Sequence, residues 1–204
     1  MQGQVEESQA RAAVHGAVAW VVVLLDINAP TMVPADSMTG ERPRPPVSLA
    51  GLVRSRTVAA LGTLHAGAPF VSMVPFAVLP EGDAFVIHVS RLAAHTKDMI
   101  DDPRVSLLVM QPEGEGAAAQ ALARVSIQGE AREMEQGSEQ ARACSEAYLA
   151  RFPEAAPLTE FADFSFFAIR PSGARFVAGF ARAMYVTAET LAKALRGINW
   201  ERLP

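Results

Sequence analysis

Residues 90–99, SRLAAHTKDM, gather side chains of the kinds that bind a phosphate group. Ser90 and Thr96 can donate hydroxyl hydrogen bonds, and His95 can donate through a ring nitrogen. Arg91 and Lys97 add positive charge. We expect this segment to lie between the end of a strand and the start of a helix, where free amides and the helix dipole attract anions. The pattern predicts a phosphate site, with an ordinary capped helix carrying a solvated Arg91 and Lys97 as the alternative.

Other reactive side chains show no catalytic spacing. The serines in or beside the expected strands lack a GxSxG motif. The four histidines, at positions 15, 65, 88 and 95, show neither HxH nor HxxxH spacing, so we expect no metal site. His65 and His88 are interpreted as structural, and Asp163 as a residue that orients a turn. Cys144 falls on the apolar face of an expected helix, and no catalytic residue is assigned.

Residues 114–119, GEGAAA, match the GxGxxA pattern of a dinucleotide-binding turn. Such a turn needs a crossover helix and then a second parallel strand. The next expected strand begins at Arg124, too close for that crossover. We interpret the glycines as a flexible hairpin loop.

The composition describes an ordinary globular domain. The chain has 204 residues, of which 50% are apolar and 20% charged, and its formal net charge is −4. An acidic balance argues against nucleic acid as the main partner, because such binding relies on a basic face. The single cysteine excludes an intrachain disulfide, and we expect a cytoplasmic location.

The first 46 residues differ in character from the rest. An apolar stretch over residues 17–25 is too short to span a bilayer as a helix, and its flanks are poor for a signal peptide. We therefore expect a loosely attached extension without membrane association, with a signal or anchor segment as the alternative. Five prolines within residues 28–46 exclude both helix and central strand. These patterns predict an N-terminal extension and linker over residues 1–46, followed by a folded domain over residues 47–204.

The folded domain is expected to be mainly β. Gly-containing turns separate apolar or alternating runs, which predict strands over residues 57–64, 70–79, 84–89, 105–110 and 124–133. Pro75 indicates an edge or a bulge in the second run. A further hairpin is expected from residues 163–170 and 174–180 across a Pro-Ser-Gly turn.

Helices are expected in four places. Ser48, Ser138 and Thr187 each precede a helical pattern as a capping residue, and the fourth helix covers residues 94–101 before Pro103. About six antiparallel strands with a few helices close into a small barrel more naturally than into an open parallel sheet. The expected class is α+β, a six-stranded antiparallel split barrel with flanking helices.

Several ordered motifs resemble those of the pyridoxamine 5'-phosphate oxidase-like, FMN-binding split barrels. They are the residues 57–64 strand, GAP at 67–69, SMVPF at 72–76, SxLAxHT at 90–96 and DPRVSLL at 102–108. The LAxHT segment, Asp163-Phe164 and GFARA at 179–183 are most similar to the haem-utilisation (HugZ-type) branch. The resemblance extends from about Val47 to Leu195.

The resemblance implies a homodimer that binds FMN at the subunit interface and acts on a small molecule. By position, the second strand would border the isoalloxazine, largely through its backbone, at Ser72, Met73, Val74 and Pro75. The phosphate would be held by Ser90, His95, Thr96 and Lys97, with Arg124 and Gln128 as weaker candidates. The expected function is that of a flavin-dependent oxidoreductase.

Departures from the family pattern leave a second function open. The oxidases carry a basic frame where this chain has Ser72 and Ala77, so true pyridoxamine-phosphate oxidase activity is not expected. Haem-degrading members use a histidine near the C-terminus, whereas the last histidine here is His95. The alternative is a haem-binding or haem-utilisation protein that uses the same interface cleft, and a regulatory module without cofactor is the third hypothesis.

Overall fold

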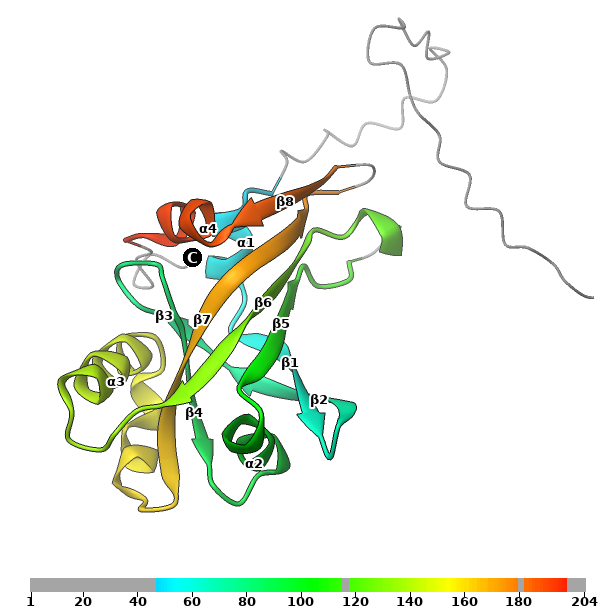
Figure 1. Ribbon diagram of the computed structural model, residues 1–204. Helices are drawn as coiled ribbons and strands as arrows, with labels where there is room; N and C mark the ends of the chain where they lie inside the picture. Colours follow the sequence, from blue (N-terminus) through cyan, green and yellow to red (C-terminus); the bar gives the residue numbers. More distant parts are fainter. Residues whose placement is uncertain (1–46, 115–117, 180–181, 198–204) are drawn as a thin grey trace, which may run out of the picture. The chain divides into compact units, whose positions relative to one another are not determined.

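The computed structural model describes residues 47–114, 118–179 and 182–197. The extension and linker expected over residues 1–46 lie outside the described residues, as does the centre of the GxGxxA loop. In the described part, one eight-stranded antiparallel sheet curls into a split barrel flanked by helices (Figure 1). The expected α+β antiparallel split barrel is therefore confirmed, with eight strands in its sheet instead of the six expected. None of the described helices has the length and apolar character needed to cross a membrane.

The strands follow the order β2-β1-β5-β6-β7-β4-β3, and β8 pairs with the end of β7. Most predicted strands are confirmed to within about a residue. The run over residues 70–79 is divided at Phe76, whose amide bonds to the carbonyl of Thr57 at 3.2 Å. The bounds are β1 (Val58–His65), β2 (Ala68–Pro75), β3 (Ala77–Val78), β4 (Phe85–Ser90), β5 (Arg104–Met110), β6 (Arg124–Glu133), β7 (Phe164–Val177) and β8 (Ala183–Thr187).

The hairpin predicted across the Pro-Ser-Gly segment is wrong, because β7 runs straight through it. Gly129 of β6 opposes Pro171, and Gln128 opposes Gly173, so Ser172 is an extra residue in a bulge. The hydroxyl of Ser172 donates to the carbonyl of Gln128 at 3.2 Å. The bulge accommodates a proline that cannot donate to the ladder. The end of β7 then pairs with β8, which was not predicted as a strand.

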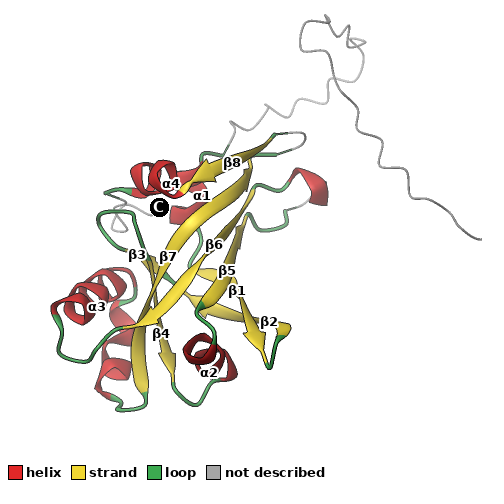
Figure 2. Cartoon of the chain, viewed as in Figure 1, coloured by secondary structure: helices red, strands yellow, loops and turns green. Residues whose placement is uncertain are grey.

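All four predicted helices are present. They are α1 (Leu49–Ser55), α2 (Ala94–Asp101), α3 (Glu139–Arg151) and α4 (Ala188–Leu195), with short 3-10 segments η1 (Ala119–Ala121) and η2 (Pro153–Glu160). Ser48, Ser138 and Thr187 accept an amide hydrogen bond at the starts of α1, α3 and α4, as expected. Figure 2 shows α1 and α4 near one end of the sheet, α2 near the other, and α3 beside β3 and β4.

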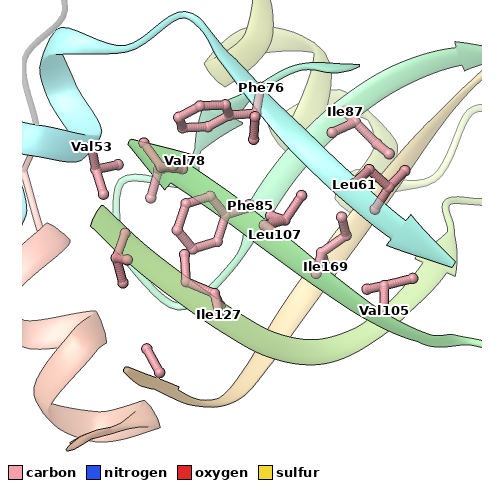
Figure 3. Close-up of a cluster of buried hydrophobic side chains, with 14 of the residues drawn as sticks. Val53, Leu61, Phe76, Val78, Phe85, Ile87, Val105, Leu107, Ile127 and Ile169 are labelled. Atoms are coloured by element: carbon pink, nitrogen blue, oxygen red, sulfur yellow. The ribbon is translucent and has the colours of Figure 1, made fainter. Parts of the chain in front are cut away.

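Strand alternation builds the core of the barrel. Leu61, Phe85 and Leu107 are at most 1% exposed and lie together inside the curled sheet with Ile127 and Ile169 (Figure 3). A second apolar cluster lies under α3, where Cys144 and Tyr148 pack with residues from β4 and β7. Both faces of β4 and β7 are thus buried in part, whereas the outer sides of β1, β2 and β5 keep exposed side chains.

Candidate functional site

The predicted phosphate segment lies where β4 ends and α2 begins, as expected. Ala93 precedes α2 with extended backbone and makes no side-chain capping bond. The amides of the first helical turn consequently have no capping side chain. This is the local geometry that attracts an anion to a helix start.

The two hydroxyl groups of this segment already donate within the protein. The Ser90 hydroxyl donates to Oδ2 of Asp163 at 2.8 Å and accepts the amide of Leu92 at 3.1 Å. The Thr96 hydroxyl donates to the carbonyl of Ser90 at 2.7 Å. A phosphate could take a hydrogen bond from Ser90 or Thr96 only if these contacts broke, and the Asp163 carboxylate would repel it.

The two cations of the segment differ in their surroundings. Nη2 of Arg91 lies 2.5 Å from Oε1 of Glu133, and its Nε donates to the hydroxyl of Ser165 at 3.2 Å. Lys97 is exposed and makes no ion pair among the described residues. Of the two, only Lys97 keeps an unneutralised charge at the start of α2.

Oγ of Ser72 and Nε2 of His95 are buried, and neither atom has a hydrogen-bond partner in the described part of the chain. Burial lowers the pKa of His95, and the nearby Asp98 carboxylate opposes that change. The two elements that carry them, β2 and α2, are in contact. Buried polar atoms without a partner are uncommon, so both can accept or donate a bond to a ligand.

The rest of the predicted β2 segment divides between the two sides of the strand. Met73 is 63% exposed, whereas Val74 is 1% exposed and belongs to the core. Pro75 ends the strand and is half-buried. A cofactor beside β2 would therefore meet the side chain of Met73 and only the backbone of Val74.

A buried carboxylate joins α2 to β1. Asp98 accepts the hydroxyl of Thr63 at 2.8 Å and pairs with Nδ1 of His65 at 2.7 Å. Burial opposes ionisation of Asp98, but hydrogen bonds from His65 and Thr63 outweigh it and lower its pKa. The contact fixes the ring of His65, whose side chain is 59% exposed. No group of three metal-ligating side chains occurs among the described residues.

Three arginines line a hollow of about 370 Å³ on the outer face of the sheet, which we call the arginine hollow. Arg124 comes from β6, Arg175 from β7, and Arg182 immediately precedes β8. No carboxylate is found among its described lining residues. None of the three arginines forms an ion pair with a described residue, although Nη1 of Arg124 donates to the carbonyls of Gln120 and Leu122 at 3.5 Å and 3.0 Å. The remaining lining residues are Gln120, Ser126, Val177, Gly179 and Ala183. Unneutralised guanidinium groups at one place form a site for carboxylates or phosphates.

Two side chains extend the arginine hollow along the same face. Tyr185 is directly opposite Arg175 on β8 and is 85% exposed, with its ring centroid 5.6 Å from the guanidinium. Met110 is opposite Arg124 on β5 and is 40% exposed. Gln128, the other weak candidate, lies outside the hollow beside a neighbouring groove. The hollow therefore joins cationic, aromatic and apolar groups.

Sequence patterns alone did not identify Arg175 or Tyr185 as site residues. Alternation along β7 predicts which residues share a face with Arg175, but not the strand that lies beside it. The pairing of β7 with β8 brings Tyr185 to Arg175, and the pairing of β6 with β7 brings Arg124 to them. His65 could have been noticed as a histidine at a strand end, but its partner Asp98 is 33 residues away.

The curled antiparallel sheet and its flanking helices define the protein as a split barrel. The family model described as pyridoxamine 5'-phosphate oxidase matches residues 48–178. The chain belongs to the pyridoxamine 5'-phosphate oxidase family.

Its named relatives place the chain in the haem-utilisation (HugZ-type) branch. It is similar to the non-canonical heme oxygenase HOZ, chloroplastic, of Arabidopsis thaliana, at 36% identity over 125 residues, which is 61% of this chain and 36% of that protein. It is also similar to heme oxygenase HutZ of Vibrio cholerae, at 29% identity over 140 residues, covering 68% of this chain and 78% of HutZ.

A solved structure of the heme binding protein from Mycobacterium smegmatis has a TM-score of 0.63 and 31% identity, and the match covers 70% of this chain and 57% of that one. The match thus spans about a third of the Arabidopsis protein and somewhat over half of the mycobacterial chain.

Proposed function

We propose that this protein binds haem on the outer face of its sheet, with the propionate carboxylates of haem at the arginine hollow. The observation that carries the proposal is the cluster of Arg124, Arg175 and Arg182 without a carboxylate in the described lining. Planar guanidinium groups bind carboxylates through paired hydrogen bonds. Relatives named as heme oxygenases and a heme binding protein support the same class of ligand.

The segment expected to hold FMN supports a flavin less well. Its two hydroxyl hydrogens are donated to Asp163 and to the Ser90 carbonyl, and Arg91 is paired with Glu133. A phosphate dianion would have to compete with those partners. FMN binding, and with it oxidoreductase activity on a small molecule, is the second candidate, favoured by the exposed Lys97 and the unpartnered ring nitrogen of His95.

Tyr185 would be a candidate ligand for the iron of a haem bound at this hollow. It is highly exposed, shares the hollow's face and has an oxygen that can bind ferric iron. His65 is the last residue of β1, at the end of that strand next to Arg104, and Arg104 is opposite Glu130 in the register of β5 and β6. Arg124 is six residues from Glu130 along β6, which is about 20 Å in a strand. This separation argues against a single haem that contacts both His65 and Arg124 of one chain.

A homodimer through the same face would complete the site. An apolar strip, formed by Val58, Val71, Met73 and Met110, lies across β1, β2 and β5, with exposed fractions from 36% to 67%. Strand alternation and register place these side chains on the face that carries Arg124. Exposed apolar side chains along a sheet indicate a surface that becomes covered. We propose that a second copy covers the strip and supplies the apolar contacts that a porphyrin needs.

Bound haem would supply iron with its redox chemistry and a strong absorption at about 400 nm. The chain's own contribution is to hold and orient it: the arginines fix the carboxylate edge, and the apolar strip excludes water from the ring. Titration of the purified full chain with haemin, followed by visible absorption, tests the proposal directly. FMN is titrated in parallel.

Substitutions at the arginine hollow make the test specific. Arg124→Gln and Arg175→Gln should each raise the Kd for haemin by about 10–100-fold, since a charge-assisted hydrogen bond contributes about 1.5–3 kcal/mol. The matched control is Arg132→Gln on the same strand, an exposed arginine 3.7 Å from Glu130, which should change the Kd less than about three-fold. Tyr185→Phe should change the absorption spectrum of the bound haem.

Two results would overturn the proposal. The first is that haemin fails to bind stoichiometrically to the wild-type protein, and the second is that the hollow variants bind it as tightly as Arg132→Gln does. If FMN binds instead and Lys97→Ala weakens it, the flavin candidate replaces the haem candidate.

A further inference from the structure

A second cavity lies at the other end of β6 and β7 from the arginine hollow. It has a volume of about 540 Å³ and is enclosed by the first half of α3, the end of β6, η2 and the start of β7. His88 of β4 lines it, and we call it the His88 cavity. Its size is within the range of small-molecule sites in proteins.

His88 is an unusual residue in this position. It is 7% exposed and its imidazole makes no hydrogen bond to a described residue, although its ring nitrogens are not among the fully buried atoms without a partner. Most buried polar side chains have a partner, because losing the bonds to water costs free energy. An imidazole that lines a cavity and lacks a partner is therefore available to a molecule in that cavity.

Aromatic rings hold the imidazole and form an apolar wall. The ring of Phe166 stacks on His88 with centroids 4.3 Å apart and planes inclined by 26°. Phe164 lies 5.1 Å away and Tyr148 5.8 Å away, both tilted. Phe164 and Phe166 also line the cavity. A stacked aromatic wall favours a flat, unsaturated ligand.

Burial lowers the pKa of His88, so its imidazole is neutral near pH 7. A neutral imidazole has one ring nitrogen that donates and one that accepts a hydrogen bond. A ligand that complements it needs the same pair of functions in its own ring. This condition selects heteroaromatic compounds over hydrocarbons.

The positive and negative charges of the residues that line the cavity cancel. Arg91 and Glu133 are paired at 2.5 Å, and Arg142 and Glu135 contribute one further charge of each sign. The formal charge of the lining is therefore zero. A ligand with a net charge would find no excess of the opposite sign, in contrast to the situation at the arginine hollow.

We propose that the His88 cavity binds an uncharged, planar heteroaromatic compound, which exchanges a hydrogen bond with His88 and lies against Phe164 and Phe166. This site is separate from the arginine hollow, which is lined by the start of β6, the end of β7 and the start of β8. The proposal does not depend on haem binding.

Benzimidazole is a suitable probe, because it is flat, neutral near pH 7.4 and has both a donating and an accepting ring nitrogen. Indene has the same fused shape without nitrogen and serves as the matched control ligand. Binding to the full chain is measured by calorimetry and by ligand-observed NMR. We expect saturable binding of benzimidazole, weaker binding of indene, and no gain from adding a carboxylate to the benzimidazole ring.

His88→Phe keeps an aromatic ring in the stack and removes both nitrogens. It should lower the affinity for benzimidazole at least about ten-fold while leaving that for indene within about three-fold. Ser145→Trp, a substitution in the lining from α3, should fill the cavity and weaken both probes. Haemin affinity and the circular dichroism spectrum should stay as in the wild type, which separates loss of the site from loss of the fold.

The proposal is refuted if benzimidazole fails to saturate the wild-type protein up to its solubility limit. It is also refuted if His88→Phe and Ser145→Trp bind benzimidazole as the wild type does. Arg124→Gln should bind benzimidazole normally, so failure here and failure of the haem proposal give different results.

Discussion

Gly82 permits close contact between a turn and the last helix. It lies between β3 and β4 at a φ of 77°, a conformation that side chains disfavour. A Cβ at this position would lie 2.3 Å from the carbonyl oxygen of Ala192 and 2.7 Å from the amide of Arg196. These are backbone atoms of α4 and its C-terminal cap, so a rotamer change cannot relieve the clash. Gly82→Ala should therefore displace the helix.

Gly67→Ala provides a matched control for the magnitude. Gly67 has a φ of 81°, and a Cβ there would meet no atom within 4 Å, so the substitution adds only left-handed strain of about 1–2 kcal/mol. Gly82→Ala adds the same strain and also loosens α4, where Leu191 and Leu195 are fully buried. Exposing each leucine costs about 1.5–3 kcal/mol, so complete detachment would add about 3–6 kcal/mol. We expect Gly82→Ala to lower the free energy of unfolding by at least about 2 kcal/mol more than Gly67→Ala does.

Urea unfolding of the two variants, measured side by side, gives this difference. Hydrogen exchange adds a local test, because the amides of α4 should exchange faster in Gly82→Ala and at the wild-type rate in Gly67→Ala. The reasoning is refuted if the two variants unfold within about 0.5 kcal/mol of each other. Unchanged protection of α4 would refute it as well.

Two further predictions concern the stability of the protein at acidic pH and its oligomeric state. Burial opposes ionisation of Asp98, but hydrogen bonds from His65 and Thr63 lower the pKa of its carboxyl group. These bonds therefore stabilise the folded protein fully near neutral pH, and this stabilisation is lost as the pH falls below the usual aspartate range. Asp98→Asn should flatten this part of the urea-unfolding profile against pH, and an unchanged profile would contradict the assignment. Met73→Glu should turn the proposed dimer into a monomer in sedimentation equilibrium, whereas Leu158→Glu, at an exposed position in η2, should leave it intact. A monomeric wild type would disprove the dimer.

The distribution of binding groups in this chain separates two kinds of anion site. The start of α2 has free amides, but its hydroxyl groups and Arg91 have partners within the protein. The arginine hollow has little backbone contribution but three guanidinium groups without a carboxylate in the described lining. A phosphate group suits the first kind of site when its donors are free, whereas guanidinium groups bind both carboxylates and phosphates. The engaged donors at the start of α2 weaken the predicted phosphate site, and this is the physical reason for placing FMN second.

Local patterns in the sequence determined most of the elements. Alternation over residues 124–133 predicts β6 with its bounds, and Pro103 together with the preceding helical segment predicts α2. Capping by Ser48, Ser138 and Thr187 follows from the chemistry of single residues, because the bond forms within the first turn of the helix. The expected position of the phosphate segment, between a strand and a helix, was equally a local property.

Contacts between distant segments could not be predicted in this way. A Pro-Ser-Gly sequence is compatible with a turn or with a bulge. Pairing with β6 makes it a bulge within β7. The engagement of Ser90 by Asp163 joins residues 73 positions apart. The sequence therefore identified the candidate donors but not whether those donors were free.

The sequence by itself determined the fold class, the strand faces and the family motifs, since these depend on periodicity and on neighbouring residues. Only the tertiary structure brought Arg124, Arg175 and Arg182 together and placed Tyr185 beside them. It also buried His88 among aromatic rings without a polar partner. Strand pairing and helix docking depend on the whole chain, because many weak apolar contacts decide which segments meet.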